Sequence, residues 1–272
     1  MTLQRPRLLM PFAIVAVALM AGSFSACAAG TESAGAAQEG DVVPAQPVDR
    51  LAASPYMRTL ADSPIYDEIW ERPQLSKRDR SMITIAVLQA LGRDTALRIH
   101  LGRGLDHGLT PEELSEIILH VSFYTGWPSG VDASLAAIDV FAERGITLGE
   151  LTGAPPMPEV ETPAGLSDAY AAVPRLGALR NSLLYGDVWE RPLLSKRDRS
   201  LITVAVNQSR YFTNELRLHI DRALDQNGVT PQELSEVVLH ITFYAGWPPA
   251  VNAGRLLTEA LRSRGIDLAE LE

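Results

Sequence analysis

Two glutamate–histidine pairs are the residues of this sequence best suited to chemistry. Glu116 lies four residues before His120, and Glu236 lies four residues before His240. On a helix, residues four apart share a face. A carboxylate beside an imidazole can fix its tautomer and raise its pKa, which suits a general acid near neutral pH. Each pair is therefore a candidate acid–base site.

Other polar and aromatic side chains recur near the two pairs. His100 and His219 lie upstream, at positions expected to face a seam between helices, and the hypothesis to test is that His100, Glu116 and His120 converge on one cavity. Arg98 and Arg217 could hold a substrate carboxylate, although residues two apart do not share a helix face. The other candidates for substrate binding are aromatic: Tyr124, Trp127, Tyr244 and Trp247.

The same residues also have structural interpretations. A Glu–His pair can be an ordinary helix-surface pair, and a histidine at the edge of an apolar stripe can be a hydrogen-bonded core residue. His107 has no histidine partner in the second half of the chain and is interpreted as a loop residue. We expect the four tryptophans to pack in the core and two arginines to make structural ion pairs: Trp70, Trp127, Trp189, Trp247, Arg80 and Arg199.

The recurring residues belong to a tandem duplication. Residues 70–100 align without a gap with residues 189–219, and 19 of the 31 positions are identical. After a one-residue insertion, residues 110–128 match residues 230–248. Neighbouring apolar positions drift among Ile, Leu, Val and Met, as a tolerant core allows. The match predicts two copies of one domain.

Helix signals dominate both copies. Ser76 and Asp79 have the spacing of a capping box. A second helix start is predicted by Thr110 as the cap, Pro111 at the first helical position and Glu113 closing the box. No segment alternates with period two, so we expect an all-α fold. Helices are expected over about 76–92, 94–106, 110–126 and 127–144, over the matching residues of the second copy, and as lead-ins over 51–66 and 165–185.

The N-terminal residues predict export. Arg5 and Arg7 precede a short apolar run and small residues, which is typical of a signal peptide. Cys27 is a candidate lipidation site of a bacterial lipoprotein, with ordinary signal-peptide cleavage as the alternative, so we expect a periplasmic protein or one tethered to a membrane. The predicted segments are a signal peptide (1–27), a flexible tether (28–50), a first domain (51–148), a Pro-rich linker (149–164) and a second domain (165–272).

Composition limits the classes of partner and chemistry. The net charge of −9 argues against nucleic acid. Cys27 is the only cysteine of the sequence, so chemistry that needs a cysteine pair is excluded. Two histidines and one carboxylate per copy could hold a metal, but their spacing matches no zinc motif. A small carboxylate is the expected ligand, and a metal-assisted enzyme stays open as an alternative.

The longest runs of these motifs resemble the carboxymuconolactone decarboxylase family. Residues 199–253 carry the resemblance most clearly, with RxH, NGVTPxELxExxLH and YxGxP motifs, and residues 80–133 carry it slightly less well. The resemblance implies two tandem helical domains of the alkylhydroperoxidase D-like (AhpD-like) fold. It also implies hexameric rings of single domains, and hence a homotrimer for a fused pair. The catalytic roles carried over fall on His100, Glu116, His120, His219, Glu236 and His240.

The resemblance further implies decarboxylation of γ-carboxymuconolactone to an enol-lactone without a cofactor. Alkylhydroperoxidase relatives use a CxxC pair, which neither copy contains, so thiol peroxidase activity is not expected. Export does not fit the cytoplasmic location expected of aromatic catabolism, which leaves the substrate open. We therefore expect a cofactor-free lyase or isomerase acting on a small carboxylated or lactone-like compound. A non-catalytic exported binding or assembly protein is the alternative.

Overall fold

The computed structural model describes residues 51–150 and 170–271, which belong to one compact unit, Arg50–Glu272. The predicted signal peptide, Cys27, the tether and most of the linker lie outside the described residues. Within the described part, no helix is both long and apolar enough to cross a membrane. The same part contains helices and no strand, which confirms the all-α prediction.

Each copy folds as four helices preceded by a helical lead-in. The lead-ins are α1 (Pro55–Leu60) with η1 (Ala61–Ile69), and α6 (Pro174–Leu179) with η4 (Arg180–Tyr185) and η5 (Val188–Glu190). The first copy continues with α2 (Lys77–Ala90), α3 (Asp94–Asp106), α4 (Pro111–Thr125) and α5 (Trp127–Glu143). The second continues with α7 (Lys196–Ser209), α8 (Thr213–Asp225), α9 (Pro231–Ala245) and α10 (Trp247–Ser263). Short turns η2 (Leu148–Glu150) and η6 (Leu268–Glu270) follow α5 and α10.

The predicted helix starts are correct, with one difference in detail. Thr110 and Glu113 form a full capping box at α4. At α2, the Ser76 hydroxyl accepts from the Asp79 backbone N–H at 3.1 Å. The Asp79 carboxylate does not complete a box there, because it accepts instead from Arg197 of the other copy at 2.9 Å. The side chain at this helix start therefore joins the two copies.

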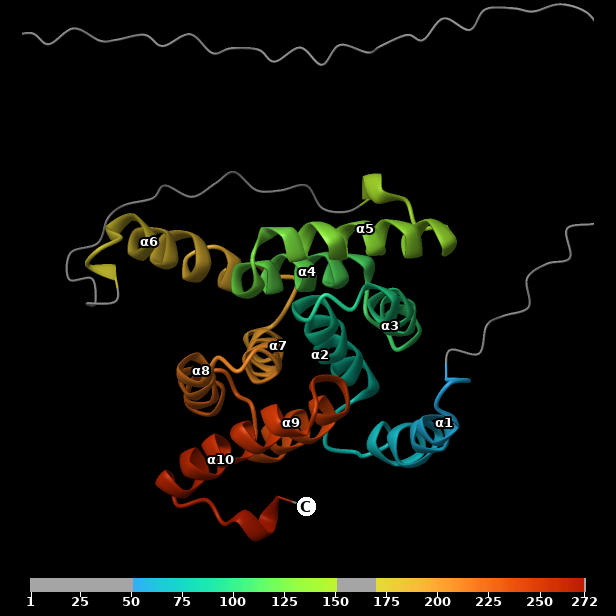
Figure 1. The fold of residues 1–272 in the computed structure, drawn as a ribbon. Helices are drawn as coiled ribbons and strands as arrows, with labels where there is room; N and C mark the ends of the chain where they lie inside the picture. The colour runs from blue at the N-terminus through green and yellow to red at the C-terminus, as the bar shows by residue number, and fades with distance from the viewer. Residues whose placement is uncertain (1–50, 151–169, 272) are drawn as a thin grey trace, which may run out of the picture. The chain divides into compact units, whose positions relative to one another are not determined.

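The two copies interlock through their central helices. In Figure 1, α2 and α7 lie side by side between the α4–α5 pair and the α9–α10 pair. Besides its neighbours in its own copy, α4 packs on α7, and α9 packs on α2. Apolar side chains from both copies form one continuous buried cluster. This crossed packing decides which functional side chains meet.

Candidate active site

The polar candidates gather in two equivalent clusters, and each cluster takes residues from both copies. The first site joins Trp70, Arg72, Arg80, Thr84 and His100 of the first copy to Glu236, His240 and Tyr244 of the second. The second site joins Trp189, Arg191, Arg199, Thr203 and His219 to Glu116, His120 and Tyr124.

The hypothesis that His100 converges with Glu116 and His120 is therefore wrong. His100 contacts Tyr244 and His219 contacts Tyr124, each on the helix that carries the Glu–His pair of the opposite copy. The reason is the crossed packing, because α9 lies against α2 and α4 lies against α7.

The two glutamates are buried acceptors of arginine. Glu236 is 2% exposed and accepts from Arg72 Nε and from Arg80 Nη2, both at 2.9 Å. Arg80 is completely buried and also donates to the Arg72 carbonyl at 2.7 Å. Glu116 repeats the arrangement with Arg191 and Arg199. Arg80 and Arg199 are thus the structural ion-pair residues that the sequence predicts.

The histidines of the two pairs have both ring nitrogens occupied. His240 Nε2 lies 2.9 Å from Thr84 Oγ1, and its Nδ1 lies 3.3 Å from Arg80 Nη1. A guanidinium can only donate, so Nδ1 accepts and the neutral ring carries its proton on Nε2. The Thr203–His120–Arg199 contacts repeat this geometry.

This environment lowers the pKa of His120 and His240, whereas the sequence predicted that it would be raised. Burial, with Arg80 and Arg199 as secondary causes, holds the pKa of His240 and of His120 well below its usual value. The expectation that the glutamate raises this pKa fails, because an arginine contacts both the carboxylate and the imidazole. These two histidines therefore shape the sites, and neither has a ring nitrogen left for a ligand.

His100 and His219 differ from them because each keeps an unused ring nitrogen. His100 is 5% exposed, stacks on Trp70 with centroids 6.0 Å apart, and meets the edge of Tyr244 at 5.4 Å. Its Nδ1 has no hydrogen-bond partner among the described residues, and the same holds for His219. Burial lowers the pKa of each ring to about 3. Each is a neutral, buried imidazole with one ring nitrogen that has no hydrogen-bond partner among the described residues.

A tryptophan contacts both the histidine and the tyrosine of each site. Trp70 stacks on His100, and Trp189 stacks on His219. Trp70 Nε1 donates to the Tyr244 hydroxyl at 3.0 Å, and Trp189 Nε1 donates to the Tyr124 hydroxyl at the same distance. Burial raises the pKa of both tyrosines well above the usual value, so they remain protonated. The structure thus places Tyr124 and Tyr244 inside the sites.

A pocket opens beside each cluster. The first, of about 200 Å³, is lined by Trp70, Arg103 and His107 among others. The second, of about 220 Å³, has Trp189, Arg222 and Asn227 in its wall. His100 does not line the first pocket itself, but it stacks on Trp70, which does.

Each pocket holds one arginine beside a tyrosine. Arg103 donates to the Tyr66 hydroxyl at 2.6 Å and lies 4.8 Å from the centre of that ring. Arg222 lies 4.7 Å from the centre of the Tyr185 ring. Within the described ranges neither arginine makes an ion pair, so each is a cation available to an anionic ligand. Sequence reasoning missed these residues, although their recurrence 119 residues apart was a visible signal.

The arginines that the sequence proposed for substrate binding lie elsewhere. Arg98 pairs with Asp139 on the surface, and Arg217 pairs with the exposed Glu259 at 3.0 Å. They point away from the clusters because residues two apart on a helix face different directions. Neither one lines the pocket of its site.

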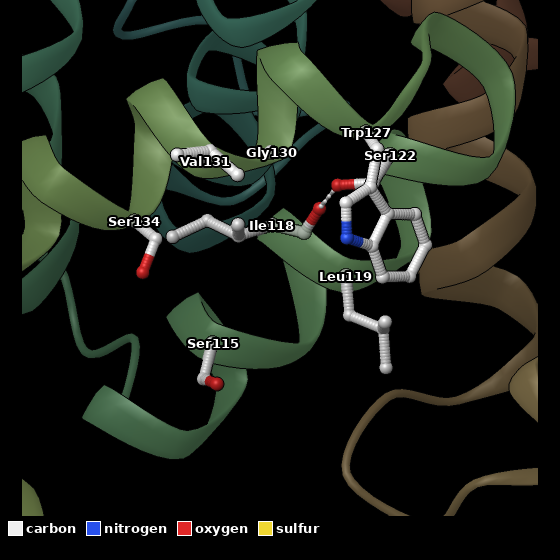
Figure 2. Close-up of a pocket in the computed structure, with 8 residues that line it drawn as sticks. All are labelled: Ser115, Ile118, Leu119, Ser122, Trp127, Gly130, Val131 and Ser134. Carbon is white, nitrogen blue, oxygen red and sulfur yellow. Dashed lines mark hydrogen bonds between the residues drawn. The ribbon is translucent and has the colours of Figure 1, made fainter. Parts of the chain in front are cut away.

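Trp127 and Trp247, which the sequence proposed for substrate binding, lie outside both sites. They are 61% and 65% exposed, so the expectation of core packing is wrong. Trp127 lines a separate pocket of about 270 Å³ between α4 and α5, shown in Figure 2. Its neighbours there include Ser115, Ser122 and Ser134, and none of the eight lining residues is ionisable. This pocket lacks acid–base groups, so it is not the candidate active site.

His107, interpreted from sequence as a loop residue, belongs to the first pocket. It follows the last residue of α3, its Nδ1 lies 2.7 Å from Ser81 Oγ, and its ring centre lies 5.6 Å from that of Trp70. In the second copy, Asn227 Nδ2 donates to the matching Ser200 hydroxyl at 2.8 Å. The one-residue insertion thus hides a structural equivalence between a histidine and an asparagine.

No group of three or more His, Cys, Asp or Glu side chains suited to a metal ion occurs within residues 51–150 and 170–271.

The model for the carboxymuconolactone decarboxylase family matches residues 65–139 and 174–259.

Two curated decarboxylases are similar to part of the chain. The 4-carboxymuconolactone decarboxylase of Acinetobacter baylyi is 47% identical over 81 residues, which is 30% of this chain and 60% of that protein. The nitrosuccinic acid decarboxylase of Metarhizium robertsii is 41% identical over 69 residues, which is 25% of this chain and 48% of that protein. The matches therefore span less than two thirds of either relative.

Proposed function

The chain belongs to the carboxymuconolactone decarboxylase family, and from this premise we propose that it removes carbon dioxide from a small carboxylic acid at two composite sites, without a cofactor. The observation that carries the proposal is the combination, at each site and among residues 51–150 and 170–271, of a histidine nitrogen without a partner and a nearby arginine without an ion pair. Both relatives are named as decarboxylases of an acid, which supports the same reaction class.

Substrate binding is assigned to the pocket cations. The Arg103 guanidinium can donate charge-assisted hydrogen bonds to a carboxylate or another oxygen of the ligand. Lys77 also lines this pocket, where Glu71 holds it at 2.5 Å. A carboxylate that leaves water for a partly buried pocket loses hydration, which favours its conversion to neutral carbon dioxide. Arg222 and Lys196 have these roles in the second site.

The reaction itself requires an electron sink in the substrate and one proton donor. The bond between the carboxylate carbon and its neighbour breaks, carbon dioxide leaves, and the electron pair is delocalised into an acceptor group of the substrate. Arg103 and the Tyr66 hydroxyl can stabilise the resulting oxyanion. A proton delivered to carbon completes the product.

We assign that proton to His100 in the first site and to His219 in the second. The free rings are neutral, but a bound anion next to an imidazole raises its pKa. The ring can therefore take up a proton from water as the substrate binds and pass it to the carbanionic carbon. This transfer returns the ring to its neutral resting state, so each turnover consumes one proton from the solvent. The buried Glu236–Arg80–His240 cluster positions the surrounding side chains and takes no part in proton transfer.

Release of carbon dioxide from γ-carboxymuconolactone by the full chain tests the proposal. We expect activity in the parent, and a loss of about 100-fold or more in the His100→Asn/His219→Asn double variant. Arg103→Gln with Arg222→Gln should raise KM strongly, whereas Arg98→Gln with Arg217→Gln, on the same helices, should change it less than twofold.

Three results would contradict this assignment. Unchanged activity in the folded histidine double variant would remove these residues from the chemistry. Ligand binding without any release of carbon dioxide would favour the non-catalytic binding protein. Activity lost to EDTA and restored by a divalent metal would favour the metal-assisted alternative.

A further inference from the structure

The two pockets differ in the charge of their walls. The first pocket has two basic side chains, Lys77 and Arg103, and two acidic ones, Glu71 and Asp106. The second has two basic side chains, Lys196 and Arg222, but a single acidic one, Glu190, and its remaining polar wall is formed by the amides Gln226 and Asn227. The second wall therefore has one acidic side chain fewer, although Asp106 of the first wall is already paired with Arg144 at 2.7 Å.

A third cation increases this difference. Arg180 begins η4, and its guanidinium lies 4.7 Å from the centre of the Tyr185 ring, the same distance as that of Arg222. Burial is the main cause of the lowered pKa of His219, and Arg222 and Arg180 lower it further, so both arginines lie within electrostatic reach of that ring. The residue that matches Arg180 in the first copy is Ala61.

Arg180 also lacks a neutralising partner in the described residues. Its Nη1 donates to the neutral Asn181 side chain at 2.9 Å, and no ion pair of Arg180 or Arg222 is found in that part of the chain. Two guanidiniums beside one tyrosine, next to a pocket with a single acidic group, leave an excess of positive charge. A ligand with an additional carboxylate is the complementary occupant.

We propose that the second site takes a more highly charged polycarboxylate than the first site, and that Arg180 determines this preference. The inference rests on the proposed function in one respect, that both pockets bind carboxylates. The first pocket has Ala61 in place of Arg180 and therefore suits a ligand with fewer carboxylates. One chain would then act on two members of one chemical class.

The test needs a signal from each site. Trp70 and Trp189 supply one, because their indole N–H groups are distinct NMR probes that Trp70→Phe and Trp189→Phe assign. The full chain is titrated with glutarate and with propane-1,2,3-tricarboxylate. We expect the Trp189 signal to report about tenfold tighter binding of the tricarboxylate than of glutarate, and the Trp70 signal less than about threefold.

Two reciprocal substitutions test whether Arg180 causes the preference for the tricarboxylate. Arg180→Ala should remove most of the preference at Trp189 and leave Trp70 unaffected, whereas Ala61→Arg should create a preference at Trp70. Arg255→Ala, which changes the net charge equally on exposed α10, should alter neither site. Retention of all four indole signals confirms that each variant is folded.

Equal preferences at the two sites, or an Arg180→Ala effect no larger than that of Arg255→Ala, would overturn the inference while leaving the proposed function intact. If neither indole signal responds to either acid, carboxylate binding itself fails, and the proposed function fails with it.

Discussion

The first and second sites are alike where they are buried and different where they meet the pocket. Glu236 accepts from its two arginines at 2.9 Å and 2.9 Å, and Glu116 accepts from its pair at 2.8 Å and 2.9 Å. At the pocket, His107 is replaced by an asparagine, and Ala61 is replaced by Arg180.

The buried clusters are alike and the pocket rims differ because a substitution destabilises the fold more in the buried cluster than at the rim. A substitution in the buried cluster leaves a charge without its partner, so both copies keep the same residues there. Side chains at the pocket rim remain partly hydrated and can differ at little cost to the fold. Differences between the sites are therefore expected to alter ligand preference more than stability.

Removing a buried arginine is expected to have the largest effect. Arg80→Met and Arg199→Met each leave a buried glutamate with one cation instead of two, and each should lower the free energy of unfolding by about 3–5 kcal/mol. Urea unfolding of the full chain measures the loss. Arg98→Met, a substitution of an exposed arginine, should leave the midpoint almost unchanged. Losses that differ more than about twofold between Arg80 and Arg199 would show that the two buried clusters are not equivalent.

Acid should destabilise both sites to the same extent. The pKa of His100 and of His219 falls from 6.5 in the unfolded chain to about 3 in the folded one. The unfolded chain therefore binds more protons between these values, so stability is highest above pH 6.5 and is lost as the pH falls toward 3. Each buried ring contributes a slope of about 1.4 kcal/mol per pH unit in that window.

Unfolding at a series of pH values checks this slope. His100→Asn and His219→Asn should each reduce the slope of stability against pH by about 1.4 kcal/mol per pH unit, and the two reductions should be equal. A stability that is independent of pH from 6.5 to 5 would contradict the neutral, buried state assigned to these histidines.

The outer helices differ in a way that bears on assembly. The surface of α5 exposes Trp127, Val131, Leu135 and Ile138. On α10 the matching positions after Trp247 and Val251 are Arg255 and Thr258. Exposed apolar surface of this kind marks contact sites, and we propose that three chains associate with the α5 face buried.

Light scattering should then give three times the chain mass for the parent. Leu135→Arg with Ile138→Thr, which copies the α10 surface, should lower that mass. Leu218→Arg, at another exposed leucine on α8, should not lower it. A monomeric parent at micromolar concentration would contradict the assembly.

A smaller difference lies after the first helix of each copy. Gly92 has a φ of 62°, and Tyr211 at the matching position has a φ of 57°, which strains a residue with a side chain. Tyr211→Gly should therefore raise the free energy of unfolding by about 1 kcal/mol, and Gly92→Tyr should lower it by a similar amount. Thermal unfolding measures both. If Tyr211→Gly destabilises the chain, contacts of the half-exposed ring outweigh the strain.

The fold was predictable from the sequence because its signals are local. Thr110, Pro111 and Glu113 specify a helix start within four residues, and Gly92 and Gly126 mark ends in the same way. The chemical identity of the Glu–His pairs was equally visible. These features depend on spacing along one helix, which a sequence displays directly.

The composition of the sites was not predictable, because it depends on contacts between copies. Glu236 carries the same local pattern whether α9 packs on its own α7 alone or on α2 as well. Arg103 and Tyr66 recur in both copies, but only the folded chain brings them to one pocket. His107 lies in a turn after α3 as the sequence predicts, but its place in the pocket was not visible, because the insertion displaces Asn227, its spatial counterpart, by one position.

The central claim, that each site is built from both copies, is tested most directly by a double-mutant cycle on Trp70. The Trp70 indole donates to Tyr244 of the other copy at 3.0 Å. Trp70→Phe and Tyr244→Phe, measured singly and together by urea unfolding, should therefore show a coupling of about 1 kcal/mol. Trp70→Phe and Tyr124→Phe should be additive. Coupling between Trp70 and Tyr124 of the same copy, with Tyr244 additive, would contradict the crossed assembly of the sites.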